Sequence, residues 1–102
     1  MSKIDELIGD VEQWAEDRMI LMHSKPMPQL MKTMSELGEL ADATLKNDRK
    51  EIVDGIGDVL VTLIIYSALQ FVTIEAALQA AYDEIKDRKG WLTPEGVFVR
   101  QT

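Results

Sequence analysis

The sequence contains no cysteine and a single histidine, His23. Without cysteine the chain can form no disulfide and no thiolate metal site, and it cannot use a thiol as a catalytic nucleophile. Basic residues are also few: the sequence has 11 lysines and arginines but 18 aspartates and glutamates, which gives a net charge of −7. The phosphate backbone of a nucleic acid repels such a protein, so we expect no nucleic-acid polymer as a partner.

The chain also lacks a basic segment followed by an apolar one at its start, where Met-Ser-Lys-Ile-Asp-Glu-Leu is charged and amphipathic. We therefore expect no export signal and a cytoplasmic protein. The most apolar stretch, 52–72, has an uninterrupted core that is too short to cross a bilayer, and Asp54 and Asp58 lie in its first two turns. We interpret it as a buried central helix and expect no membrane partner.

Apolar residues recur at helical spacing in four segments of what we expect to be a single domain, residues 1–102. The predicted helices cover about 2–20, about 28–46, a segment that contains 52–72, and about 74–89. The predicted fold class is therefore all-α, an antiparallel bundle of about four helices with a short extended C-terminal tail. Helices so few and so apolar must hide surface against another subunit, so we expect a homo-oligomer, either a dimer or a tetramer.

The expected helix ends follow from local side-chain chemistry. Two prolines within 23–28 predict a loop there, and Asn47 is a suitable stop for the second helix. Asp48 and Thr73 are suitable N-caps for the third and fourth helices. Gly90 is expected to end the last helix, and the tail to contain a turn and one short strand.

Acidic residues form one pair on the second predicted helix, Glu36 with Glu39, and one on the third, Asp54 with Asp58. Residues three or four apart share a helix face, where like charges repel. An ionised carboxylate held away from water is costly unless a positive charge compensates it. Carboxylate oxygens suit Mg²⁺, with Mn²⁺ as the alternative, better than zinc. We therefore expect these side chains to bind a divalent cation between the two helices.

Three motifs carry a family resemblance: Lys32-Thr-Met-Ser-Glu36-Leu-Gly-Glu39-Leu, Asp54-Gly-Ile-Gly-Asp58-Val-Leu-Val, and Asp83-Glu-Ile-Lys86-Asp-Arg88-Lys89-Gly. In this order, over about 14–90, the sequence resembles the MazG-like all-α nucleoside triphosphate pyrophosphohydrolases. The resemblance implies an enzyme with the all-α NTP pyrophosphatase fold that uses Mg²⁺ to hydrolyse an NTP or dNTP to the monophosphate and pyrophosphate. It also implies that Glu36, Glu39 and Asp58 act both as catalytic residues and as metal ligands.

The second acidic pair departs from the family pattern, which is usually Glu-x-x-Asp. Gly55 stands three residues before Asp58 and has no side chain to bind a metal. Asp54 lies on nearly the same face and is our preferred substitute, with Glu51 as an outside candidate. The departure leaves an alternative function open, a catalytically reduced helical module that binds nucleotide or a partner protein without turnover. A purely structural bundle with solvated acids is a third interpretation.

Substrate binding is assigned to residues on three of the predicted helices. Lys86, Arg88 and Lys89, near the end of the fourth helix, carry charges that complement a triphosphate, as does Lys32. Cations at a helix C-terminus also complement the helix dipole, so that explanation of the cluster stays open. We include Asp83 because it stands where the family commonly has an asparagine. Trp14 could stack on a nucleobase or pack in the core.

Overall fold

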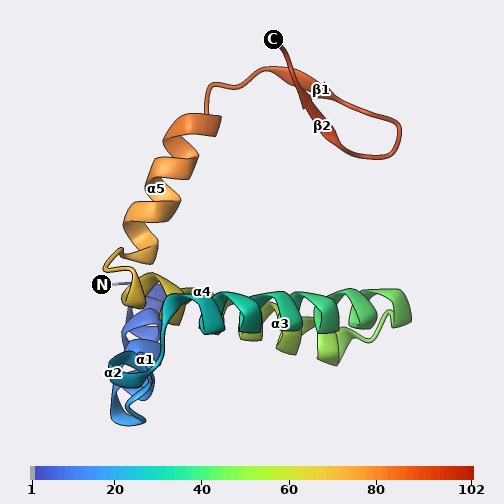
Figure 1. Ribbon diagram of the computed structural model, residues 1–102. Coiled ribbons are helices and arrows are strands. Elements are labelled where there is room, and N and C mark those ends of the chain that lie inside the picture. Colours follow the sequence, from blue (N-terminus) through green and yellow to red (C-terminus); the bar gives the residue numbers. More distant parts are fainter. Residues whose placement is uncertain (1) are drawn as a thin grey trace.

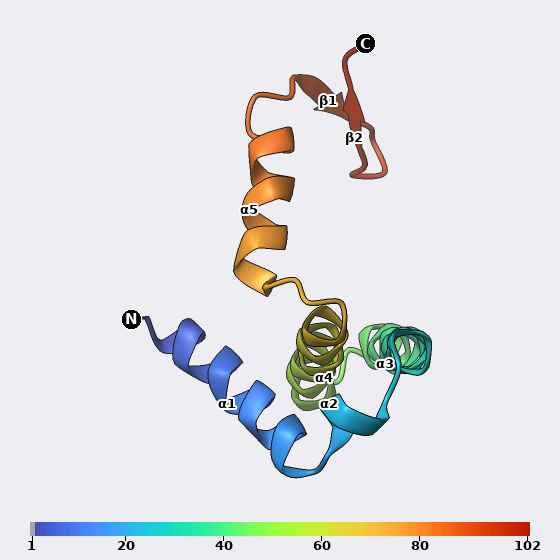
Figure 2. The same ribbon diagram turned by 60° about the vertical axis from the view of Figure 1, so that its left-hand side comes forward.

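The computed structural model describes residues 2–102, and over this range the prediction of an all-α fold is confirmed (Figure 1). The elements are α1 (Lys3–Asp17), α2 (Ile20–His23), α3 (Pro26–Lys46), α4 (Arg49–Leu69), α5 (Ile74–Ile85), β1 (Gly90–Leu92) and β2 (Phe98–Arg100). The long helices α3 and α4 lie side by side, and α1 and α2 pack against α4. Figure 2 shows α5 leaving this group of helices at the end of α4 and carrying the strands away from it.

Helices α3 and α4 form an antiparallel pair because the turn between them is short and its residues are suited to it. Asn47 takes the left-handed conformation, with φ of 52°, and ends α3 as predicted. The Asp48 side chain accepts a hydrogen bond from the backbone N–H of Glu51 at 3.2 Å and starts α4, also as predicted. Both effects are local, so they fix the turn independently of what packs around it.

Two contacts set how closely α3 and α4 approach each other. The buried Thr33 hydroxyl donates a hydrogen bond to the Thr62 hydroxyl at 2.8 Å, which joins the two helices. Gly55 is buried nearer the start of α4, and a Cβ atom there would lie 3.0 Å from Cδ1 of Leu40. A side chain at position 55 would therefore meet α3, so the glycine permits close packing.

The N-terminal part differs from the prediction in two places. The expected helix over 2–20 is interrupted, because Met19 adopts a φ of 64° between α1 and α2. The expected loop over 23–28 is also shorter, since α3 begins at Pro26. Pro26 and Pro28 occupy the first turn of α3, where backbone N–H groups have no acceptor within the helix, so neither proline costs a hydrogen bond.

The C-terminal part begins as expected and then diverges. Thr73 caps α5, and its side chain accepts a hydrogen bond from the Ala76 N–H at 3.0 Å. The helix ends at Ile85 rather than near 89, and the tail holds two strands instead of one. Gly90 starts β1 rather than ending the helix, and a Cβ there would collide with the carbonyl oxygen of Val99 on β2. The glycine is therefore required by the antiparallel pairing of the strands.

The chain buries little apolar surface by itself. The expected inward stripe of α5 is uncovered, with Leu78 67% exposed and Tyr82 56% exposed, because α4 is the only other described element that α5 contacts. The interpretation of α4 as a buried central helix holds only in part. By length and composition α4 could also cross a membrane, and only 28% of its most apolar window is buried. A large apolar surface thus remains on both helices.

Candidate active site

An acidic cavity of about 350 Å³ lies between the C-terminal half of α3 and the N-terminal half of α4. Its lining residues are Glu39, Asp42, Lys46, Glu51, Asp54, Gly55 and Asp58. Because the two helices are antiparallel, Glu39 lies toward the end of the cavity where Asp58 stands, and Lys46 toward the end where Glu51 stands. Three of the four predicted metal ligands therefore line one cavity.

The fourth predicted ligand, Glu36, lies one turn before Glu39 and is largely buried. Its side chain is 13% exposed, and its Oε1 atom is 3.9 Å from Nζ of Lys32. The other oxygen, Oε2, is buried without a hydrogen-bond partner among the described residues. Burial raises the pKa of the Glu36 carboxyl, the nearby Glu39 and Asp58 raise it further, and Lys32 lowers it. Carboxylates from both helices thus lie close enough to influence one another.

The predicted ligands do not converge on a point. Within residues 2–102, no three aspartate, glutamate or histidine side chains lie close enough together to form a metal site as they stand. Mutual repulsion favours such a separation between carboxylates that face the same space. The structure therefore brings the two acidic pairs to one place without a preformed coordination sphere.

Asp58 borders a second, apolar cavity, which the sequence did not predict. This cavity of about 440 Å³ is lined by Leu7, Asp10, Val11, Trp14, Asp58 and Val61, from α1 and α4. Asp58 is exposed rather than enclosed in a buried helix, because this face of α4 is open to solvent. Trp14 is 44% exposed and is not a core residue. The Arg18 guanidinium lies 4.6 Å from the centre of its ring, in a cation–π contact.

Comparison with known proteins identifies the family. The sequence profile of the MazG nucleotide pyrophosphohydrolase domain matches residues 26–93, about two thirds of the chain. The chain belongs to this family. The match begins at the first residue of α3 and reaches past α5, so it includes both acidic pairs and the basic cluster.

A phage protein and a solved structure both resemble this MazG domain. An uncharacterised 18.2 kDa protein from the rep-hol intergenic region of Haemophilus phage HP1 is 43% identical over 65 residues, which are 64% of this chain and 40% of that protein. The chain thus matches less than half of its relative's length. The fold resembles that of the cyanophage S-2L MazG-like pyrophosphohydrolase, with a TM-score of 0.72, 20% identity and full coverage of both chains. That structure is described as bound to dGDP and three catalytic Mn²⁺ ions per active site.

The structure does not bring the predicted basic cluster of this MazG domain to the acidic cavity. Lys86 forms an ion pair with Asp83 at 3.4 Å, and Arg88 forms one with Glu84 at 3.0 Å. These residues and Lys89 lie at or beyond the end of α5, which points away from α3 and α4 (Figure 2). The segment 70–73 sets that direction, and sequence periodicity carries no information about it. Of the predicted phosphate-binding cations, only Lys32 is beside an acidic pair.

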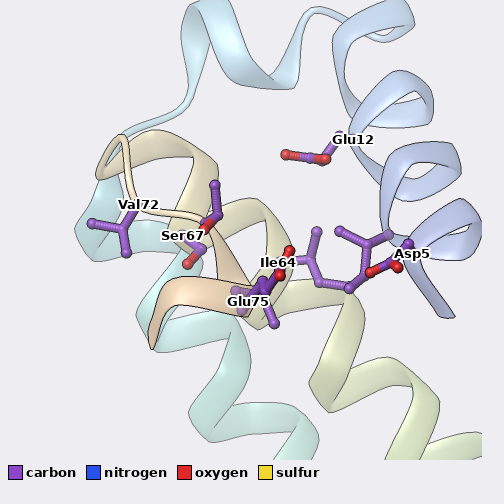
Figure 3. A pocket seen from close by; sticks show the side chains of 9 residues that line it. Asp5, Glu12, Ile64, Ser67, Val72 and Glu75 are labelled. Atoms are coloured by element: carbon purple, nitrogen blue, oxygen red, sulfur yellow. The ribbon is translucent and has the colours of Figure 1, made fainter. Parts of the chain in front are cut away.

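A separate cavity of about 330 Å³ lies where α1, the end of α4 and the start of α5 meet. In Figure 3, Asp5 and Glu12 extend from α1, opposite Ile64 and Ser67 of α4 and Glu75 of α5. None of the predicted site residues of the MazG domain lines it, and no buried unpartnered side-chain atom is found there within residues 2–102. It is the space left by the divergence of α1 and α5, and we assign it no function.

Sequence reasoning missed two residues that line the acidic cavity, Asp42 and Lys46. A signal for them was present, because Glu39, Asp42 and Lys46 are spaced by three and four residues and so share a face of α3. Glu51, the outside candidate of the prediction, lines the cavity as well. The cavity is therefore longer than the two acidic motifs, and it extends to the turn between the helices.

Proposed function

We propose that this MazG domain is a Mg²⁺-dependent nucleoside triphosphate pyrophosphohydrolase, which releases a nucleoside monophosphate and pyrophosphate. The observation that carries the proposal is the acidic cavity, because it gathers in one place carboxylates from α3 and α4, two helices of the family's matched segment. The S-2L protein, which shares the fold, is described as holding a nucleotide and catalytic Mn²⁺ ions, and this agrees with the proposal.

The residues present fit a divalent cation. The Oε2 atom of Glu36 is buried and has no hydrogen-bond partner in residues 2–102, and a carboxylate held in that way needs positive charge nearby. Glu36, Glu39, Asp54 and Asp58 offer only carboxylate oxygens, the donors that Mg²⁺ and Mn²⁺ prefer. We propose these four residues as the ligands of Mg²⁺, or alternatively of Mn²⁺. When bound, the ion would supply positive charge against the phosphate oxygens of the substrate.

The protein's own groups account for orientation and proton transfer. The apolar cavity beside Trp14 suits a nucleobase, and Asp58 lines both that cavity and the acidic one. A triphosphate would then extend from Asp58 along α4 toward Asp54. The oxygen of a water molecule attacks the α-phosphorus, the bond to the bridging oxygen of the β-phosphate breaks, and pyrophosphate leaves. The proposed acceptor of the water's proton is a carboxylate of the first acidic pair, Glu36 or Glu39.

We further propose that the enzyme is a homo-oligomer. The exposed apolar stripe of α5 and the poorly covered surface of α4 leave many large apolar side chains open to solvent, and such surfaces commonly bind another subunit. Helix α5 carries Lys86, Arg88 and Lys89 away from the acidic cavity of their own chain. If these residues and Asp83 bind the triphosphate as predicted, they must therefore do so at the acidic cavity of a second copy of the chain.

The test is pyrophosphate release from a panel of NTPs and dNTPs in the presence of Mg²⁺. We expect turnover by the wild-type protein and a loss of about 100-fold or more in Asp58→Ala and in Glu39→Ala, which is a typical contribution of a group that acts in proton transfer or charge stabilisation. Glu16→Ala removes an exposed carboxylate of α1 outside the cavity and serves as the matched control. Tight nucleotide binding without turnover would contradict the proposal and support the binding-module alternative.

A further inference from the structure

We propose that Lys46 binds the terminal phosphates of the nucleotide. This inference rests on the proposed function and adds to it a residue outside the two acidic motifs and the basic cluster. Lys46 is the last residue of α3, and it is the one cation among the residues that line the acidic cavity. All the other charged residues that line the cavity are carboxylates.

The first argument is that Lys46 is free, whereas most of the other candidate cations are engaged. Each of three other cations forms an ion pair with a carboxylate three or four residues away in the sequence: Lys32 with Glu36, Lys86 with Asp83, and Arg88 with Glu84. Lys46 forms no ion pair within 4.0 Å in the part of the chain that the structure describes, although Asp42 and Glu51 line the same cavity. Its ammonium group therefore remains available to an anion that enters the cavity.

The second argument is the position of Lys46 along the cavity. Lys46 follows Glu39 by two helical turns, which is about 10.5 Å along α3. Asp58 lies at the opposite end, and it also lines the apolar cavity beside Trp14. A nucleotide with its base beside Trp14 and its reacting phosphorus between Glu39 and Asp58 would direct its outer phosphates toward Lys46. The left-handed Asn47, which ends α3 directly after Lys46, fixes the backbone from which this side chain extends.

The third argument is chemical. A triphosphate brings several negative charges into a cavity that is already acidic, so its outer phosphates need a cation that the carboxylates do not neutralise. A lysine ammonium group supplies a point charge of this kind, and its bond to a phosphate oxygen is charge-assisted. The competing explanation is that Lys46 only complements the negative C-terminal end of the α3 dipole. The two explanations make different predictions for triphosphate binding, because a lysine that only complements the helix dipole adds no affinity for the outer phosphates.

Calorimetry on Lys46→Gln separates them. With Mg²⁺ present, we expect the Kd for an α,β-methylene nucleoside triphosphate to rise about tenfold, the size expected for a charge-assisted hydrogen bond. The Kd for the nucleoside monophosphate should not change, because it lacks the outer phosphates. For Mn²⁺ alone, the variant should bind as tightly as the wild type or more tightly, because a positive charge has left the acidic cavity. Lys50→Gln, the same change on an exposed residue of α4 outside the cavity, is the control and should alter none of these values.

Kinetics give a second readout. A residue that holds the outer phosphates equally in the ground and transition states changes KM and leaves kcat within about twofold. Lys46→Arg, which keeps the charge, should restore most of the affinity. An unchanged Kd for the triphosphate analogue, an equal loss for triphosphate and monophosphate, or weaker Mn²⁺ binding would each overturn the inference. A wild-type protein that binds the analogue but does not hydrolyse natural NTPs or dNTPs would refute the proposed activity, yet the binding comparison would still decide the role of Lys46.

Discussion

Replacing the buried carboxylate of Glu36 with an amide should stabilise the protein when divalent metal is removed by a chelator. The side chain is 13% exposed, and Oε2 has no hydrogen-bond partner in the described part of the chain. A buried polar atom left without a partner costs about 1–3 kcal/mol, and more when it is charged. Lys32, at 3.9 Å, recovers less than about 1 kcal/mol because its side chain is 64% exposed. Glu36→Gln keeps a polar side chain in the same place and removes only its charge, so we expect it to raise the free energy of unfolding by roughly 1 kcal/mol at pH 7.

The pH dependence gives this prediction a definite sign. Burial, Glu39 and Asp58 raise the pKa of the Glu36 carboxyl in the folded protein above its ordinary value of 4.5. Between those two pKa values the folded protein binds more protons than the unfolded chain, so the wild type loses stability as the pH rises. Below pH 4.5 the carboxyl is protonated in both states and the loss is absent. The advantage of Glu36→Gln should therefore grow as the pH rises above 4.5 and become constant above the raised pKa.

Thermal unfolding between pH 4 and pH 8 in the presence of a chelator is the measurement. For a domain of this size, 1 kcal/mol corresponds to a shift in Tm of about 4–8 °C. Glu16→Gln, which neutralises an exposed carboxylate on α1, is the control and should shift Tm little at any pH. Added Mg²⁺ should stabilise the wild type more than Glu36→Gln, because the ion binds the folded state through a carboxylate that the variant lacks. A Tm for Glu36→Gln below that of the wild type at pH 7, or an equal advantage at pH 4, would refute the reasoning.

Two further variants test the packing of the helices and the assembly. Gly55→Glu, which restores the acid common in the family, should lower the free energy of unfolding by roughly 1–3 kcal/mol in urea titrations, because its Cβ would press on Leu40. Gly57→Glu is the control, since nothing lies within 4 Å of a Cβ there, and equal losses in the two variants would contradict the packing argument. Leu78→Asp, on the exposed stripe of α5, should dissociate the oligomer in light scattering, whereas Gln13→Asp on α1 should not. A monomeric wild type would rule out the oligomer.

The sequence predicted those parts of the fold that depend on neighbouring residues. Asn47, Asp48 and Thr73 end or begin helices where expected, because each acts locally. Asn47 ends its helix through its own backbone conformation, and the side chains of Asp48 and Thr73 each accept a hydrogen bond from a backbone N–H three residues later. The interruption at Met19 was missed, since a left-handed methionine has no local sequence signal. The start of α3 was misplaced because a proline that breaks a helix interior is harmless in its first turn.

The sequence likewise predicted those parts of the site that depend on spacing within a helix and on a short turn. Spacing along α3 and α4 puts each acidic pair on one helix face, and the short antiparallel turn brings those faces to one cavity. The direction of α5 depends instead on four residues after α4, so the relation of Lys86 and Arg88 to the cavity could not be read from periodicity. Periodicity shows which face of a helix is apolar, and it does not show what covers that face.

The replacement of the family's usual acid by Gly55 is best explained together with Asp54. At position 55 a Cβ would lie 3.0 Å from Cδ1 of Leu40 and 3.4 Å from its Cα, so a side chain there would require Leu40 to shift by a few tenths of an ångström. Asp54 lines the same cavity, and it reaches that space without entering the contact with Leu40. The close approach of α3 and α4 and the acidic lining are therefore compatible in this chain because the glycine and the aspartate occupy adjacent positions.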